Sequence, residues 1–269
     1  MIRMYRYSGA GNSFIVIDGR DVEIPRFRKP GTIHALCLIN RTDGLMILDK
    51  SDRADFRMEY YNSDGSGGMM CGNGGRCIVA FADLLGVKPF HTKDYVFEAP
   101  DGMHEASILS HLGECKVVRL KMRDVDGVVP VLDGLFLNTG TRHFVQFADD
   151  VEAVDVAVRG AQLRRNPAFA PEGANVNFVG VDPDGTLRVR TFEKGVEAET
   201  LSCGTGITAS AMAAYVRGIR PARTGEGGLV HYDIQARQDR LAVDFIPDGD
   251  GRFTDVFLTG PTICEGVLE

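Results

Sequence analysis

Two cysteines carry the strongest chemical signal in this sequence. Cys71 opens the segment C-G-N-G, and Cys203, 132 positions later, opens C-G-T-G. Each segment leads into a helix-forming run that ends at a glycine, Gly86 or Gly218, as a C-terminal cap requires. A helix N-terminus has unpaired N–H groups and a partial positive charge, so a cysteine there has a lowered thiol pKa. Two such thiols could invert a carbon: the thiolate removes its proton, and the thiol returns one to the opposite face.

The competing explanation of these cysteines is structural. The chain has six cysteines and no C-x-x-C, and in a reducing compartment they should be free thiols. Any one of them could be a small buried hydrophobe or a metal ligand. The matched contexts of Cys71 and Cys203 favour chemistry, and no clustered His/Cys spacing predicts a metal. The other four are expected to be structural: Cys37, Cys77, Cys115 and Cys264.

The sequence before each cysteine repeats as well. A stretch of alternating polarity at 56–60 and then a polar loop precede the first cysteine, and 187–191 with its own polar loop precedes the second. Alternation with period two is typical of a half-buried strand. Asn62 stands nine residues before the first cysteine and Glu193 ten before the second. Their equivalent places in the repeat make both candidate site residues.

The starts of the two halves also match. Each is a strand, a glycine-containing turn and a strand, at 5–18 around Gly9 and Gly11 and at 135–147 around Gly140. The runs after the cysteines are nearly uncharged, which predicts helices buried on all sides. We therefore predict an α/β (α+β) fold of two pseudo-symmetric domains from an internal duplication. Each domain is expected to be a curled, mostly antiparallel sheet around a central buried helix.

The repeat also sets the expected boundaries. Residues 1–118 with 262–269 should form the half that contains Cys71, and 119–261 the half that contains Cys203. A linker is expected near 116–128. Because duplication tends to place equivalent positions face to face, we expect the active site in the cleft between the halves.

Composition narrows the class of protein. The chain has 269 residues, of which 44% are hydrophobic and 25% charged, as in globular proteins. A net charge of −7 without a long basic run argues against nucleic-acid binding. No apolar run is long enough for a membrane span, and the N-terminus lacks the apolar core of a secretory signal. We expect a cytoplasmic protein with no nucleic-acid or membrane partner.

Five segments resemble diaminopimelate epimerases in order and spacing along nearly the whole chain. They are S-G-A-G-N at 8–12, Y-Y-N-S-D-G-S at 60–66, M-C-G-N-G-G-R-C at 70–77, A-N-V-N-F at 174–178 and F-E-K-G…E-T-L-S-C-G-T-G at 192–206. The resemblance implies a homodimer of two-domain α/β chains. It also implies epimerisation of LL-diaminopimelate to the meso form, without pyridoxal phosphate or metal, in lysine and peptidoglycan precursor biosynthesis.

The resemblance implies a role for each matching residue. Cys71 and Cys203 are the acid/base pair, His143 and Glu193 tune the thiols, and Glu193 also holds the substrate ammonium. Backbone N–H groups at the two helix starts hold the reacting carboxylate and stabilise the charge that spreads onto it. The substrate-binding positions so implied are Asn12, Asn62, Gly72, Asn73, Thr141, Asn175, Glu193, Lys194, Gly204 and Thr205.

The chain departs from the family pattern in three places. Lys194 replaces the usual arginine, Thr141-Arg142 replaces Asn-Pro, and the loop 193–203 is one residue longer. Lysine offers a point charge where arginine grips a carboxylate through two N–H bonds. These departures leave open a racemase of another amino acid, histidine for example. Proline-racemase-type enzymes have C-G-H at one cysteine, where this chain has Asn73.

The polar candidates also have simpler explanations. His143 could be a satisfied buried histidine. The asparagines Asn12, Asn62 and Asn175 could form turns, and Lys194 could be a solvated charge. A thiol redox or metal-binding protein would use the same cysteines, but the missing C-x-x-C argues against it.

Overall fold

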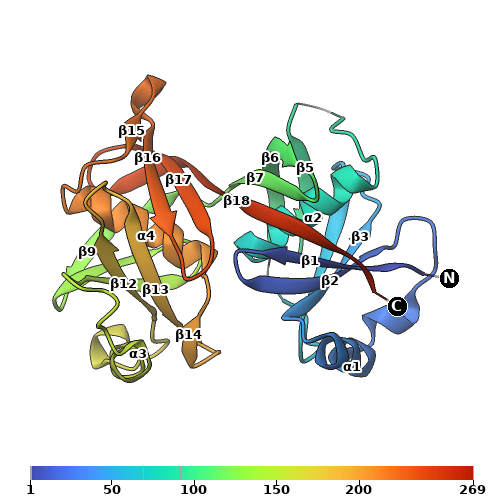
Figure 1. Ribbon diagram of the computed structural model, residues 1–269, viewed down its shortest axis with the longest axis horizontal. Coiled ribbons are helices and arrows are strands. Elements are labelled where there is room, and N and C mark those ends of the chain that lie inside the picture. Colours follow the sequence, from blue (N-terminus) through green and yellow to red (C-terminus); the bar gives the residue numbers. More distant parts are fainter. Residues whose placement is uncertain (1, 69, 91–92, 269) are drawn as a thin grey trace. The chain divides into compact units, whose positions relative to one another are not determined.

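The structure is a computed structural model that describes residues 2–68, 70–90 and 93–268. The described chain is a mixed α/β protein, mostly strands with four α-helices. It divides into two compact units, one made of Met1–Leu120 with Gly260–Glu269 and the other of Lys121–Thr259 (Figure 1).

The first unit contains two α-helices, one short 3₁₀ helix and seven strands, completed by the end of a long C-terminal strand. These elements are β1 (Met4–Gly9), β2 (Asn12–Asp18), η1 (Pro25–Arg28), α1 (Pro30–Asn40), β3 (Gly44–Asp49), β4 (Phe56–Asn62), α2 (Gly72–Leu84), β5 (Tyr95–Ala99), β6 (Gly102–Leu112), β7 (Cys115–Lys121) and the end of β18 (Arg252–Leu268).

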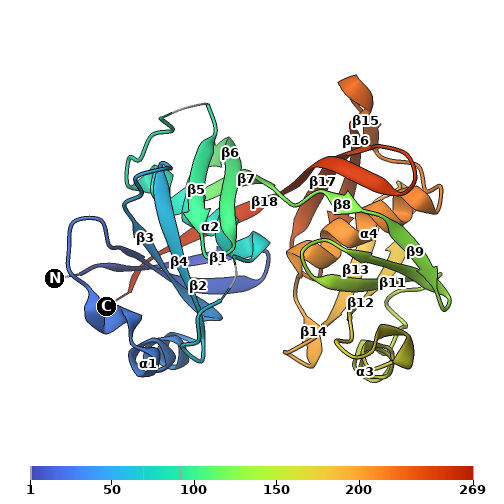
Figure 2. The ribbon, with the colours of Figure 1, turned by 180° about the vertical axis from the view of Figure 1, so that it is seen from behind.

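Each strand of the first unit pairs with the next, and the last pairs with the first. Antiparallel pairs β1–β2, β3–β4, β5–β6 and β6–β7 alternate with the parallel pairs β2–β3 and β4–β5. The end of β18 closes the series, because it is antiparallel to both β7 and β1. The sheet thus curls around α2, which contacts β1, β2, β3 and β6 (Figures 1 and 2).

The second unit has the same kinds of element around a second helix. They are β8 (Val125–Asp126), β9 (Val128–Val131), β10 (Gly134–Asn138), β11 (Arg142–Phe147), α3 (Val156–Arg164), η2 (Pro167–Phe169), β12 (Asn175–Val181), β13 (Leu187–Glu193), β14 (Ala198–Thr200), α4 (Gly204–Val216), β15 (Arg223–Thr224), η3 (Glu226–Gly228), β16 (Val230–Gln235), β17 (Arg240–Pro247) and the first part of β18.

Pairing in the second unit follows the same alternation. Antiparallel pairs β10–β11, β12–β13 and β16–β17 alternate with the parallel pairs β11–β12 and β13–β16. The first part of β18 is antiparallel to β17 and β8. The helix α4 contacts β10, β11, β12, β13, β16 and β17, so this sheet too surrounds its helix.

The two helices that follow the cysteines are buried, as their uncharged sequences predict. Side chains 78–82 of α2 and 209–214 of α4 are at most 1% exposed. The last turn of α4 reaches the surface, where Tyr215 is 37% exposed, and Thr205 in its first turn is half-buried. Both helices stop before a glycine with positive φ, Gly86 at 72° and Gly218 at 77°, which confirms the two predicted caps.

The segment 116–128, expected to be a linker, is mostly strand. β7 continues to Lys121, β8 covers Val125–Asp126 and β9 begins at Val128. β7 pairs with the preceding strand β6 and β9 with the following strand β10, and β18 pairs with both β7 and β8. The linker prediction missed the two local pairings, and the pairing with β18 lies too far along the sequence for a local pattern to show it.

Candidate active site

Cys71 lies at the N-cap of α2, as its position before the glycines predicts. Its backbone is extended, with φ −100° and ψ 147°, and its sulfur accepts a hydrogen bond of 3.2 Å from the N–H of Gly74. A Cβ on Gly74 would lie 3.2 Å from that sulfur, tighter than ordinary contact, so glycine keeps the space open. The half-buried thiol therefore sits where an N–H group and the helix dipole stabilise its thiolate.

Two predicted substrate residues meet beside this helix start. The side-chain N–H of Asn73 donates to the carboxamide oxygen of Asn12 at 2.7 Å. The oxygen of Asn73 in turn accepts from Arg76 at 2.9 Å, and Arg76 also donates to the carbonyl of Gly72 at 3.2 Å. Because Asn73 is 2% exposed and Arg76 is fully buried, these bonds fix the amide rigidly.

Arg76 was missed by the sequence reasoning. Its side chain is 0% exposed, although arginine is rarely buried unless it is paired. The signal was present, since Arg76 is a charged residue at the start of an otherwise nearly uncharged helix. Cys77, one residue later, is fully buried, and burial raises the pKa of its thiol far above the usual range. Cys77 is therefore a neutral core residue, as expected.

Asn62 occupies a turn at the end of β4. Its N–H donates to the carbonyl of Ser66 at 2.9 Å, and its side-chain amide donates to the Ser66 hydroxyl at 3.0 Å. The N–H of Gly65, which has φ 84°, donates to the Asn62 carbonyl at 2.9 Å. These bonds match the simpler explanation, in which this asparagine forms a turn.

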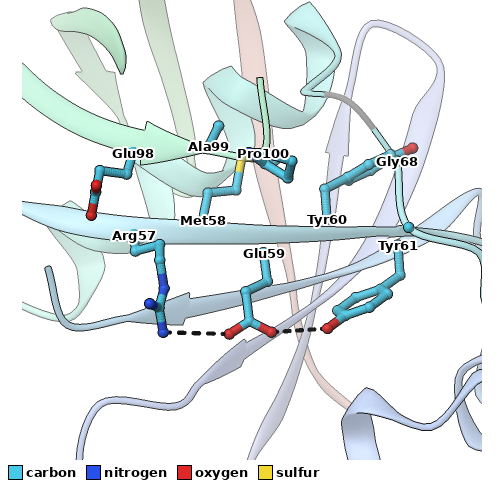
Figure 3. A pocket seen from close by; sticks show the side chains of 10 residues that line it. Arg57, Met58, Glu59, Tyr60, Tyr61, Gly68, Glu98, Ala99 and Pro100 are labelled. Atoms are coloured by element: carbon cyan, nitrogen blue, oxygen red, sulfur yellow. Dashed lines mark hydrogen bonds and ion pairs between the residues drawn. The ribbon is translucent and has the colours of Figure 1, made fainter. Parts of the chain in front are cut away.

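A hollow beside β4 in the same unit is a separate feature (Figure 3). It encloses about 560 Å³ and is lined by Arg57, Met58, Glu59, Tyr60, Tyr61, Gly67, Gly68, Glu98, Ala99 and Pro100. In Figure 3, Met58 and Tyr60 point to one side of the strand, and Arg57, Glu59 and Tyr61 to the other. The Glu59 carboxylate already accepts from the Tyr61 hydroxyl and from Nε and Nη2 of Arg28. None of the residues predicted for the active site lines this hollow.

Cys203 lies at the N-cap of α4 in the second unit. Its backbone is extended, with φ −123° and ψ 109°, and the residue is 9% exposed. Its sulfur lies 3.4 Å from the hydroxyl oxygen of Thr205. Thus the two helix-start cysteines differ, because a backbone N–H faces the sulfur of Cys71 and a hydroxyl faces that of Cys203.

His143, on β11, lies behind this hydroxyl. Its Nε2 is 2.9 Å from the Thr141 hydroxyl and 3.0 Å from that of Thr205, and the two hydroxyls are 3.0 Å apart. Its Nδ1 lies 3.0 Å from the side-chain amide of Asn177. The ring is fully buried, and burial lowers the pKa of His143 to about 3. Near neutral pH the imidazole is therefore uncharged, so it acts on its neighbours through hydrogen bonds alone.

Asn175 and Lys194 meet at the end of β13. The Asn175 side chain donates to the carbonyl of Arg142 at 3.1 Å and accepts from the Lys194 N–H at 2.8 Å. The Lys194 ammonium donates to the carbonyl of Glu172 at 3.1 Å. Glu193, the last residue of β13, is half-buried. The structure thus gathers Asn175, Glu193 and Lys194 at one strand end, whereas Thr141 belongs to the histidine network.

Asn177 was also missed by the sequence reasoning. It is fully buried, and its side chain contacts His143, the Phe144 carbonyl and the Thr191 hydroxyl. Because residues two apart on a strand share a face, its position after Asn175 could have identified it. In residues 2–68, 70–90 and 93–268, no group of His, Cys, Asp and Glu is arranged to hold a metal ion.

Comparisons with known proteins show which family the chain is similar to. The family model described as diaminopimelate epimerase matches residues 4–122 and 135–239. A diaminopimelate epimerase of Flavobacterium psychrophilum is 40% identical over 97% of this chain and 96% of its own. One of Aquifex aeolicus is 35% identical over 99% of this chain and 98% of its own. The crystal structure of a Bacillus anthracis PhzF-family phenazine biosynthesis protein has a TM-score of 0.70 at 12% identity, covering 99% of this chain and 98% of that one.

The fold and the sequence matches together define an isomerase with the α/β fold also found in the PhzF-family protein. Because the family model spans most of the chain and both relatives match along nearly their full length, the chain belongs to the diaminopimelate epimerase family. The resemblance inferred from the five segments is thus confirmed. In the part of the chain that the structure describes, no helix is both long and apolar enough to cross a bilayer.

Proposed function

We propose that this protein epimerises LL-diaminopimelate to meso-diaminopimelate with Cys71 and Cys203 as the two proton-transfer groups. The observation that carries the proposal is that each cysteine is the N-cap of a buried helix whose first turn is glycine-rich and closely packed. A helix N-terminus favours the thiolate of a cysteine placed there, and at Cys71 the N–H of Gly74 also donates to the sulfur. This chemistry serves lysine and peptidoglycan precursor biosynthesis.

The mechanism needs one thiolate and one thiol on opposite faces of the same carbon. The thiolate takes the Cα proton, the electron pair of the broken C–H bond spreads onto the carboxylate, and the thiol of the other cysteine gives its proton to Cα. The N–H groups of Gly72, Asn73 and of Gly204, Thr205 hold that carboxylate. Each turnover exchanges the protonation states of the two thiols, so no cofactor is consumed.

The remaining polar residues position the substrate in this proposal. Glu193 pairs with the ammonium group of the substrate, and Asn12 and Asn175 form hydrogen bonds with the polar groups of the substrate. The buried Asn12–Asn73 contact supports this, because it holds an amide next to the helix start. Thr141 and Lys194 are placed at the distal end of the substrate in this proposal, and Asn62 is a further substrate-binding residue.

The matching order of elements supports an internal duplication. In both units an antiparallel pair, a helix, a parallel partner and another antiparallel strand precede the buried helix. We infer two pseudo-symmetric domains, with the catalytic cleft between them and the domain limits near 118 and 262. A homodimer in the cytoplasm is the assembly proposed by resemblance, and sedimentation of the purified protein tests its dimeric state.

Deuterium incorporation tests the proposed reaction. LL-Diaminopimelate incubated with the protein in heavy water should acquire deuterium at Cα and yield the meso isomer, because the proton returned comes from a solvent-exchanged thiol. Folded wild-type protein that leaves the substrate unlabelled refutes the proposal.

A racemase of a monoamino acid is the second candidate. The observation that favours it is that the two residues expected at the distal end of the substrate already have hydrogen-bond partners in the protein. The Thr141 hydroxyl contacts His143, and the Lys194 ammonium donates to the Glu172 carbonyl. Turnover measured on diaminopimelate and on a panel of single amino acids, histidine included, separates the two. Faster turnover of any single amino acid favours the racemase.

A further inference from the structure

A chain of uncharged side chains ends at the sulfur of Cys203. Thr191, Asn177, His143 and Thr205 follow one another through hydrogen bonds up to that sulfur. We propose that Asn177 is a positioning residue, whose amide fixes the tautomer of His143 and so directs the hydroxyl proton of Thr205 onto the Cys203 sulfur. The inference rests on the proposed function in taking Cys203 as one of the two proton-transfer groups.

The orientation of the Asn177 amide is fixed from both ends. Its nitrogen lies 3.2 Å from the carbonyl oxygen of Phe144, which can only accept, so the NH₂ group must face that side. Its oxygen accepts from the Thr191 hydroxyl at 2.9 Å. The second N–H of the amide then points at His143 Nδ1, 3.0 Å away. Because an NH₂ group only donates, Nδ1 must be the unprotonated nitrogen of the ring.

The tautomer of His143 sets the direction of the hydroxyl bonds. With Nδ1 unprotonated, a neutral ring carries its proton on Nε2 and donates it to the hydroxyl oxygen of Thr141 or Thr205. Each hydroxyl can donate one hydrogen bond, and the Thr205 hydroxyl then donates to the Cys203 sulfur, 3.4 Å away. This direction stabilises a thiolate at Cys203. The opposite tautomer would draw a hydroxyl proton toward Nε2 and favour the thiol.

Burial makes the network rigid. His143 and Asn177 are fully buried and Thr191 is 3% exposed, so water does not replace a missing partner. The network also packs directly on α4: a Cβ on Gly206 would lie 2.3 Å from the Asn177 oxygen. The low pKa of His143, about 3, keeps the ring neutral throughout the pH range in which a thiol titrates.

Asn177→Asp tests the tautomer directly, because the carboxylate has the same size as the amide but accepts where the amide donates. In ¹⁵N-histidine-labelled wild-type protein, the His143 signals, assigned by their loss in His143→Gln, should show Nε2 protonated and Nδ1 bare from about pH 5 to pH 9. In Asn177→Asp, Nδ1 should become protonated. A merely structural role would not exchange the proton between ring nitrogens.

The same variant should change Cys203. Its Cβ resonance in ¹³C-cysteine-labelled protein, assigned through Cys203→Ser, should titrate at higher pH once the neutral ring no longer donates through Nε2. Turnover should fall about tenfold in kcat with KM little changed, as expected for one lost hydrogen bond to a charged acceptor. The proposal is overturned if Nε2 is unprotonated in the wild type. It is also overturned if Asn177→Asp changes neither the protonation of the ring nor the titration of Cys203.

Thr191→Val provides a second test that adds no charge to the core. It removes the donor to the Asn177 oxygen and should lower kcat several-fold while raising the pKa of the Cys203 thiol. Thr208→Val is the matched control, because that fully buried hydroxyl donates to the Gly204 carbonyl of its own helix, 2.9 Å away. Equal effects of the two variants on kcat and on the Cys203 titration would contradict the proposal.

The resonance measurements need no substrate, which separates this inference from the proposed function. If diaminopimelate is not epimerised but the ring and thiol signals behave as expected, the function is wrong and the network stands. If the epimerase activity is found but Nδ1 of His143 carries the proton, the network is wrong and the function stands.

Discussion

At the scale of single residues, the two helix-start cysteines have different hydrogen-bond donors. The sulfur of Cys71 accepts from the backbone N–H of Gly74, whereas that of Cys203 faces the hydroxyl of Thr205. A backbone N–H can only donate, but a hydroxyl can also accept. The Cys71 site therefore favours a thiolate, and the Cys203 site can stabilise either form according to the direction of its hydrogen bonds.

Replacing either cysteine by alanine should abolish epimerisation while the fold is kept. Cys71→Ala or Cys203→Ala removes one of the two proton-transfer groups, which we expect to lower kcat by about 10²–10⁴-fold or more. Activity and circular dichroism of each variant check this. Cys115→Ser is the matched control, since Cys115 is a half-buried thiol on β7 and should leave turnover unchanged. Full turnover in either alanine variant would contradict a two-base mechanism.

At the scale of elements, the first turns of α2 and α4 are built from glycine for reasons of space. Gly74 leaves room for the Cys71 sulfur, and Gly206 leaves room for the Asn177 amide. In α4 the glycine lets the strand β12 bring its polar side chains against the helix. The sequence pattern C-G-x-G therefore encodes close packing around the helix start as well as access for a ligand.

Gly206→Ala should destabilise the protein and slow its reaction. The added Cβ would lie 2.3 Å from Asn177 Oδ1 and 3.2 Å from His143 Cε1, which forces the network apart. Overpacking of this kind costs about 1–3 kcal/mol of unfolding free energy. Gly31→Ala in α1 is the control: nothing lies within 4 Å of its Cβ, so it should stabilise by about 0.5–1 kcal/mol. Urea unfolding measures the free energy of unfolding of both variants. Equal changes in that free energy would be evidence against this packing.

The hairpin β16–β17 should make stability depend on pH through His231. The hydrogen bond from its ring to Asp244, 2.7 Å long, raises the pKa of His231 above its usual range, although burial and nearby Arg223 oppose the rise. Because the pKa of His231 is higher in the folded than in the unfolded protein, protonation of its ring stabilises the fold. This contribution is fully present below the unfolded-state pKa of about 6.5 and is lost as the pH rises through the folded-state pKa. His231→Gln should therefore cost about 1 kcal/mol more at pH 6 than at pH 9 in urea unfolding. An equal cost of His231→Gln at both pH values would contradict a stabilising ion pair between His231 and Asp244.

At the scale of the whole molecule, the sequence predicted what is local and repeated. The cysteines at helix starts, the strands that precede them and the buried helices follow from period, charge and glycine placement within short windows. The short strand β8 could not be predicted, because its partner β18 is more than a hundred residues away, whereas β7 and β9 pair with their neighbours β6 and β10 and could have been found locally. Asn177 was missed because its partner His143 is distant in the sequence and only the fold brings the two together. Arg76 was missed although its partners lie in the same helix, because its complete burial depends on the sheet around that helix.

Oxidation tests whether Cys71 and Cys203 act on one substrate carbon, a property of the whole chain that neither unit can supply alone. Two thiols that serve opposite faces of one carbon must come near each other, and a disulfide forms when their Cα atoms approach within about 7 Å. Mild oxidation should therefore inactivate the protein, link the peptides that carry Cys71 and Cys203, and be reversed by a thiol reductant. Peptide mass mapping identifies the link, and Cys71→Ala should not form it. Inactivation by a different cysteine pair, with Cys71 and Cys203 still reduced, would contradict a shared site for the two thiols.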